Sequence, residues 1–257
     1  FLQITTSTVK DMNGQLVVAP ANGEPAGAVE ADVSAPVLKS TKLNMNKAQA
    51  ELVLVFDETV DATELQLSSI TFLNGNTAVV TLDGTSAKST AANTEVTITL
   101  SDGATNKLKL NTGAATSEET TTVRLGLGGI KDMSQVPVVE TTIAQASVFN
   151  EDLIAPTLDA FDLDMDTAKF TLTFSEAVDK STFTIGEFAL QNAPSGATSS
   201  VTLDADDSTI SSDGTTITAT LTSEVMNAIK TEEGLATNGD SAAGDDANTY
   251  LTATADS

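Results

Sequence analysis

The chain contains an internal repeat with a period of about 120 residues. Residues 35–61 resemble residues 155–179: both begin with an Ala-Pro pair and end in the pattern Phe-x-Glu-x-Val-Asp. A second marker, Lys-Asp-Met, stands at residues 10–12 and recurs at residues 131–133 with nearly the same spacing. Each unit is long enough to bury a core of its own, so the repeat predicts tandem domains rather than one merged globule.

The two markers are offset from each other, and this offset predicts the domain boundaries. The Lys-Asp-Met marker precedes each Ala-Pro pair by about 25 residues, so it belongs to the end of a unit. We expect residues 1–33 to be the C-terminal strands and linker of a preceding repeat, residues 34–153 the first Ig-like repeat and residues 154–257 the second. We also expect the last strand of the second repeat to be truncated or supplied across a junction, as in a processed piece of a longer array.

The charge and the missing residue types exclude several classes of function. The formal net charge is −24, which argues against binding nucleic acid, because such binding depends on Lys and Arg that neutralise phosphates. No apolar run approaches the roughly 18 residues of a spanning helix, so no direct membrane insertion is expected. The chain has neither Cys nor His, which removes disulfides, thiolate metal sites and the usual pairs of nucleophile and base.

Catalysis is not expected from the residues that remain. Carboxylate pairs, Lys, Ser and Thr are left to run any reaction, and carboxylates are abundant enough here to pair by chance. A glycosidase would need two acids across a cleft, with aromatic platforms for the sugar, and aromatic residues make up only 4% of the chain. We therefore predict that the protein is not an enzyme and requires no cofactor.

Alternating apolar and polar residues predict short strands throughout the chain. Residues 52–56, 96–100, 170–174 and 217–221 all place apolar side chains at every second position. Asn-Gly, Asp-Gly and Ser-Gly pairs punctuate them, at residues 74–75, 83–84, 102–103, 195–196 and 213–214, and predict turns. A helix capped by Ser223 is expected at 223–230, and a solvated loop at 232–248. The pattern favours an all-β fold of antiparallel sandwiches.

The order of these motifs resembles the bacterial-type Ig-like repeats of surface-layer proteins, large adhesins and surface proteins of algae and marine microbes. The second repeat supplies the opening pair Ala-Pro at 155–156, Leu-Thr-Phe-Ser-Glu-Ala-Val-Asp at 172–179, Asp-Gly-Thr-Thr at 213–216 and a Tyr strand at 250. The first repeat matches less well, because Ser134 stands where residues 12–14 keep the family-like Met-Asn-Gly. The resemblance implies tandem Ig-like antiparallel β-sandwich domains arranged end to end, in an extracellular, cell-surface protein.

One strand carries a candidate metal site. Asp162, Asp164 and Asp166 alternate with apolar residues, so period-two geometry puts three carboxylates on one side of a strand. Calcium takes six to eight oxygen ligands, and Glu176 or Asp179 would complete the set if the next strand returns beside them. The opposing interpretation is a solvated strand face in an acidic protein. The first repeat favours the opposing interpretation, because its equivalents, residues 42–46, have lost all three charges.

Matched acids in both repeats form a second group of candidates. Glu58 and Asp61 correspond to Glu176 and Asp179. Capping of turns through backbone N–H groups is the favoured role for them, ahead of interdomain metal binding. The acids of the Lys-Asp-Met markers, Asp11 and Asp132, are likewise expected to stabilise turns first and bind metal second. Lys10 and Lys131 are expected to pair with them or with the acids of a neighbouring repeat.

The expected function is structural. Short linkers at residues 26–35 and 147–155 predict domains that stack end to end with limited bending, in a filament, stalk or surface layer such as an algal flagellar hair or adhesive fibre. The expected partners are copies of the protein or neighbouring repeats, and the Thr-rich runs at 120–122 and 215–216 leave room for O-linked glycan. The alternative is an adhesin-type module that binds glycan or protein and is stiffened by calcium.

Overall fold

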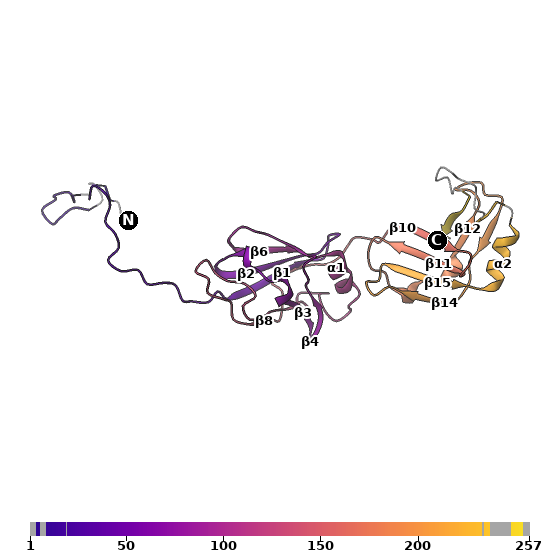
Figure 1. Ribbon diagram of the computed structural model, residues 1–257, viewed down its shortest axis with the longest axis horizontal. Coiled ribbons are helices and arrows are strands. Elements are labelled where there is room, and N and C mark those ends of the chain that lie inside the picture. The colour runs from indigo at the N-terminus through magenta and orange to yellow at the C-terminus, as the bar shows by residue number, and fades with distance from the viewer. Residues whose placement is uncertain (1–3, 6–8, 19, 233, 237–247, 254–257) are drawn as a thin grey trace.

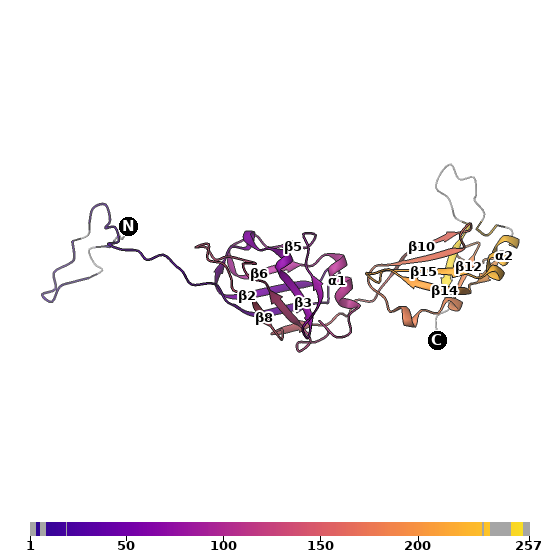
Figure 2. The same cartoon turned by 60° about the horizontal axis from the view of Figure 1, so that its bottom comes forward.

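Two β domains follow one another along the chain. The computed structural model describes residues 4–5, 9–18, 20–232, 234–236 and 248–253. Figures 1 and 2 show the two domains lined up end to end along the longest axis of the molecule, joined by a short linker. The described part of the N-terminal segment leads away from the opposite end of the first domain.

The first domain is built from two sheets and one short helix. The sheets have the strand orders β5-β6-β2-β1-β9 and β4-β3-β7-β8. Neighbouring strands are antiparallel except β1 and β9, which run parallel. The elements are β1 (Leu38–Asn44), β2 (Glu51–Val60), η1 (Ala62–Glu64), η2 (Leu67–Ser69), β3 (Ile70–Asn74), β4 (Thr77–Thr81), β5 (Ala87–Lys88), β6 (Asn93–Thr99), α1 (Asp102–Lys109), β7 (Thr122–Leu125), β8 (Thr141–Ile143) and β9 (Val148–Asn150).

In its described residues, the second domain repeats this arrangement up to the strand equivalent to β7. Its sheets have the orders β10-β11-β15-β14 and β13-β12-β16. The elements are β10 (Leu158–Asp164), β11 (Lys169–Phe174), η3 (Lys180–Thr182), η4 (Ile185–Glu187), β12 (Phe188–Gln191), β13 (Ser200–Thr202), β14 (Ala205–Ile210), β15 (Thr216–Leu221), α2 (Ser223–Thr231) and β16 (Tyr250–Ala253). Element by element, β1 to β7 of the first domain correspond to β10 to β16, and α1 corresponds to α2. Even the irregularity at the start of β1, opposite β2, recurs between β10 and β11.

Each domain has a hydrophobic core of its own. In β2 the apolar residues at every second position, Leu52, Leu54 and Phe56, are buried, as the alternating pattern predicts. They pack with residues of the other sheet, including Phe72, in a cluster that lies wholly within the first domain. A second cluster, which includes Phe170, lies wholly within the second. The chain is therefore mainly β, with several antiparallel sheets consistent with tandem β-sandwich domains.

Two predicted hairpin turns are confirmed, and one predicted turn is wrong. Gly75 and Gly214 adopt φ of 59° and 75° in the turns after β3 and before β15. The Asp-Gly pair at 102–103 instead begins α1, because the Ser101 hydroxyl caps this helix by accepting a bond from the Ala104 N–H. The helix predicted at 223–230 is present as α2, but its cap is Thr222 rather than Ser223.

The helices of the described residues are short. Neither α1 nor α2, with 8 and 9 residues, has the length and apolar character needed to cross a membrane. The loop predicted at 232–248 lies mostly outside the described residues, which omit 233 and 237–247.

Candidate functional site

The end of the acidic run that is the candidate calcium site lies in a turn in the structure. Asp164 ends β10, and its carboxylate accepts bonds from the Thr167 hydroxyl at 2.6 Å, the Thr167 N–H at 3.1 Å and the Asp166 N–H at 2.8 Å. These bonds, with that of the Thr167 hydroxyl first, lower the pKa of the Asp164 carboxyl. Asp162 lies on the same strand, opposite Thr171 of β11, and its side chain is exposed. The Asp164 carboxylate thus stabilises the turn between β10 and β11 through these three hydrogen bonds.

Glu176, the fourth predicted calcium ligand, belongs to a different site. Its carboxylate pairs with the Lys109 ammonium, at the C-terminal end of α1 in the first domain. Among the described residues, the group of three acids whose oxygens all lie within 4.8 Å of one another consists of Asp32, Glu58 and Asp132. The structure therefore does not gather Asp162, Asp164, Asp166 and Glu176 around one position.

The Lys109 ammonium is the centre of a joint between the two domains. It contacts the Glu176 carboxylate of the second domain and, at 2.9 Å, the Asp152 carboxylate of the linker. The side chains of Lys109 and Glu176 are only 7% and 9% exposed. Burial is the largest single influence on the pKa of the Lys109 amine and acts to lower it. The bonds to Glu176 and Asp152 together outweigh burial and hold the pKa above its ordinary value. The lysine is therefore charged at neutral pH and forms ion pairs with two acids.

Two further contacts fix the joint. The buried Asn106 of α1 accepts a bond through Oδ1 from the Ala177 N–H of the second domain, at 3.1 Å. Leu110 lies against Gly214, where an added Cβ would come within 2.7 Å of the Leu110 Cδ2 and 3.0 Å of the Ala177 Cβ. Gly214 is therefore favoured by its positive φ, and a side chain added there would require Leu110 to shift.

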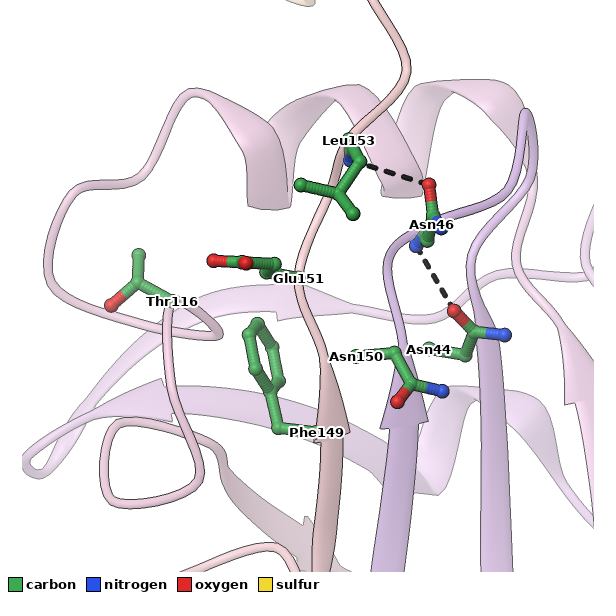
Figure 3. Close-up of a pocket in the computed structure, with 7 residues that line it drawn as sticks. All are labelled: Asn44, Asn46, Thr116, Phe149, Asn150, Glu151 and Leu153. Carbon is green, nitrogen blue, oxygen red and sulfur yellow. Dashed lines mark hydrogen bonds between the residues drawn. The ribbon is translucent and has the colours of Figure 1, made fainter.

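The linker between the domains is also bonded to the first domain. The Leu153 N–H donates to the Asn46 Oδ1 at 3.3 Å, and Figure 3 shows this bond beside an open pocket of about 460 Å³. The pocket is lined by Asn44, Asn46, Thr116, Phe149, Asn150, Glu151 and Leu153. Glu151 is the single carboxylate among these lining residues.

The acidic cluster of Asp32, Glu58 and Asp132 is the first domain's counterpart of the joint. Asp32 and Glu58 correspond to Asp152 and Glu176, the two acids that hold Lys109. Among the described residues, no lysine or arginine pairs with the three acids of the cluster. Partial burial, followed by the charges of Asp32 and Asp132, raises the pKa of the Glu58 carboxyl. The cluster is thus a set of repelling acids without a cation.

Asp132 leaves an unpaired oxygen in this cluster. The residue is buried, and its Oδ1 accepts a bond from the Val136 N–H at 2.8 Å. Its Oδ2 is buried too and has no hydrogen-bond partner in the part of the chain that the structure describes. A buried carboxylate oxygen without a donor is costly, so the position calls for a donor or cation.

The structure confirms the capping and turn-stabilising roles that were predicted for four of the acids. Asp61 and Asp179 cap η1 and η3 through the N–H groups of Thr63 and Ser181, as predicted. Asp11 and Asp132 stabilise their turns, also as predicted, by accepting bonds from the N–H groups four residues further on.

A capping role for Glu176 is wrong, because its partner is the Lys109 ammonium. Lys131 approaches Glu64 at 3.6 Å, an acid of its own domain rather than of a neighbouring repeat. Sequence reasoning missed Asn106 and Lys109 altogether. The signal that could have found them is their match with Asn227 and Lys230 in α2.

Comparisons with known proteins do not identify a family for this chain. No family model matches the chain, and no curated protein matches it. A solved structure described as "Anomalous substructure of Titin-A168169" is similar over 74% of this chain and 85% of its own, with 11% identity and a TM-score of 0.24. A score this low carries no argument about fold or function. The fold and the joint define the class as a tandem β-sandwich protein with a bonded interdomain contact.

Proposed function

We propose that the protein is a structural, extracellular repeat protein whose Ig-like domains build a filament, stalk or surface layer. The observation that carries this proposal is the joint, in which Lys109 of one domain is buried between Asp152 of the linker and Glu176 of the next domain. A chain that only tethers two independent modules has no need for such a contact.

The chemistry of the joint supports a stiff array. Separating the domains would break the Lys109–Glu176 pair, so this pair holds one relative placement of the two domains through its geometry. The Asn106 bond to Ala177 and the packing of Leu110 on Gly214 add orientation to this attraction. A rod built from such joints would transmit force along its length rather than bend at each linker.

The sequence supports the Ig-like and extracellular parts of the proposal. The motif order at 155–156, 172–179 and 213–216 resembles surface-layer and adhesin repeats, and the strong negative charge suits a hydrated surface setting. No catalytic role is proposed, because the described acids of the joint and the turns are committed to ion pairs and backbone N–H groups.

The alternative function is an adhesin-type module stiffened by calcium. Its supporting observation is the cluster of Asp32, Glu58 and Asp132, whose oxygens are the kind of ligand that calcium takes. A rise in thermal midpoint with calcium that a chelator reverses would favour this alternative.

Electron microscopy of the purified chain tests the proposal. Under the structural function we expect straight two-domain particles with one interdomain angle, and ordered filaments or sheets at high concentration. Dispersed particles with a broad spread of angles, together with a soluble glycan or protein ligand, would overturn it in favour of the adhesin.

A further inference from the structure

Part of the N-terminal segment, residues 9–17, has the same local structure as residues 130–138 near the end of the first domain. Residues 9–17 form a turn in which the Val17 N–H donates to the Val9 carbonyl at 3.0 Å, and residues 130–138 form the same turn with a bond of 2.9 Å between Val138 and Ile130. A bridge joins Lys10 to Leu16 in one turn and Lys131 to Pro137 in the other. The same position has positive φ in both turns, at Gly14 and at Gln135. Residues 9–17 therefore repeat the turn of residues 130–138, which belongs to the piece that closes the first domain.

In the first domain the closing piece, residues 130–150, completes both sheets. β8 pairs with β7, and β9 pairs with β1. Backbone bonds anchor it further, from the Asp61 N–H to the Lys131 carbonyl at 2.9 Å and from the Met45 N–H to the Asn150 carbonyl at 2.8 Å. Ile130 is 0% exposed, so the piece also contributes to the core.

The second domain is open at the same places. Among the described residues, β16 pairs with β12 alone and β10 pairs with β11 alone. The N–H groups of Asp179 and Met165 correspond to those of Asp61 and Met45, and neither has a backbone partner in the described part of the chain. Leu158 at the start of β10 is 43% exposed, whereas its counterpart Leu38 is 2% exposed. An open strand edge beside exposed apolar side chains is a template for strand addition.

The N-terminal segment carries apolar side chains that nothing described covers. Val9 is 57% exposed, although its counterpart Ile130 is fully buried. Leu16, Val29 and Val33 are exposed as well. Val29 corresponds to Phe149 of β9, which packs against the core of the first domain. Residues 9–17 thus have the turn, and the segment has the apolar residues, of a closing piece, and in the described structure these apolar side chains remain exposed.

We propose that this segment closes the second domain of another copy of the chain, joining copies head to tail. Residues 9–18 and 20–33 of one copy would lie along β16 and β10 of the preceding copy, as residues 130–150 lie along β7 and β1. This inference rests on the proposed structural function. It specifies that the partner in the assembly is a second copy of this chain. Because the two surfaces differ, each added copy leaves a free surface of each kind, and the assembly stays open-ended.

The same arrangement supplies the missing cation of the acidic cluster. The closing piece leads directly into Asp32, so the α2 end of the preceding copy would face Asp32, Glu58 and Asp132, as the α1 end faces Asp152 and Glu176. On α2 the counterparts of Asn106 and Lys109 are Asn227 and Lys230, and both are exposed. The Lys230 ammonium has three donors, and the Asp132 Oδ2 needs one. The contact between copies therefore repeats the joint within the chain.

Sedimentation velocity of the full chain over a range of concentrations, at physiological ionic strength, tests the proposal. We expect the wild type to form elongated species larger than a monomer. Lys230→Glu and Glu58→Lys should each weaken association at least tenfold, and a chain carrying both should recover part of the loss. Val9→Asp should also weaken association, through the closing piece rather than the charge pair. Lys169→Glu is the matched control, because it makes the same charge change at an exposed residue on β11, and it should leave association unchanged.

Several outcomes would overturn the proposal. One is a wild type that stays monomeric at every concentration, and another is association that Lys230→Glu and Val9→Asp leave intact. Association that needs added calcium and tolerates Lys230→Glu would make the cluster a metal site instead. The angle between the domains of the monomer, measured on the same samples by small-angle scattering, keeps the two proposals apart. A fixed angle without association refutes only the contact between copies, whereas a variable angle refutes the proposed function.

Discussion

In the first domain β9 pairs with β1 and β8 pairs with β7, whereas the equivalent sides of β10 and β16 have no neighbouring strand in the described part of the second domain. β1 lies between β2 and β9, whereas its counterpart β10 lies beside β11 alone in the described structure. The apolar residues of β1 are buried, but those of β10 are half-buried or exposed, although both strands carry the same alternating pattern. The comparison teaches that a strand pattern predicts which side chains face the core, while the neighbouring strand decides whether they are covered.

The largest expected effect is the loss of unfolding free energy when an equivalent core residue is truncated in each domain. Phe72 and Leu190 occupy equivalent, fully buried positions on β3 and β12. Phe72→Ala should cost about 3 to 5 kcal/mol and Leu190→Ala about 2 to 5 kcal/mol, through lost burial and the cavity left behind. Each should lower only its own transition in calorimetry. A shift of both transitions in either variant would show that the domains share one cooperative core.

Removal of the charge at the joint should have the next largest effect. Lys109→Met is expected to weaken the contact between the domains by about 2 to 3 kcal/mol, because Glu176 and Asp152 lose their common cation. Residual dipolar couplings should then report a broader range of domain orientations, with both folds intact. Lys107→Met, at an exposed position on the same helix, is the control and should change nothing. An unchanged orientation in Lys109→Met would assign the rigidity to Asn106 and Leu110.

A smaller increase in the stability of the first domain is expected from relieving strain in its backbone. Gln135 has a φ of 70°, in a turn whose N-terminal counterpart has Gly14 at the same position. Gln135→Gly should stabilise the first domain by about 0.5 to 1 kcal/mol, because glycine adopts positive φ without a Cβ clash. The midpoint of the first domain's calorimetric transition should rise, while the midpoint of the second domain's transition should stay unchanged. Ser134→Gly adds the same chain flexibility without relieving a positive φ, so it should lower that transition.

The smallest effect concerns the repulsion within the acidic cluster. The pKa of the Glu58 carboxyl is raised in the folded protein, so its charged form is disfavoured there. The penalty is fully present above the folded pKa and disappears as pH falls below the unfolded value of about 4.3. In the monomer, at protein concentrations too low for association, Glu58→Gln should therefore raise the thermal midpoint of the first domain by on the order of 1 °C at pH 7 and leave it unchanged at pH 3. A decrease at pH 7 would mean that a cation already satisfies the cluster.

Local features of the fold could be predicted from the sequence, because they depend on neighbouring residues. The apolar alternation of 52–56 gave the buried face of β2, and the Asn-Gly pair at 74–75 gave a hairpin. The matched Asp61 and Asp179 cap their turns because an Asp reaches the N–H two residues on. The helix α1 was missed because its Asp-Gly start has the composition of a turn, and only the Ser101 cap outweighs that signal.

The joint could not be predicted, because its partners are distant in the sequence. Lys109 and Glu176 come together only when two folded domains meet, and no local pattern distinguishes Lys109 from the exposed Lys107. The three acids at 162–166 drew attention because charges alternating along one strand are visible in sequence, whereas Asp32, Glu58 and Asp132 converge from three separate segments. Repeat alignment is the tool that bridges this gap, since it pairs Lys109 with Lys230 and Glu176 with Glu58.

The parallel pairing of β1 with β9 has a mechanical consequence. β1 is the first strand of its domain and β9 the last, and they point in the same direction. Tension applied to the two ends of this domain would draw these strands past each other lengthwise, loading their evenly spaced hydrogen bonds simultaneously instead of opening them one at a time. A domain with this geometry resists stretching through its terminal strands.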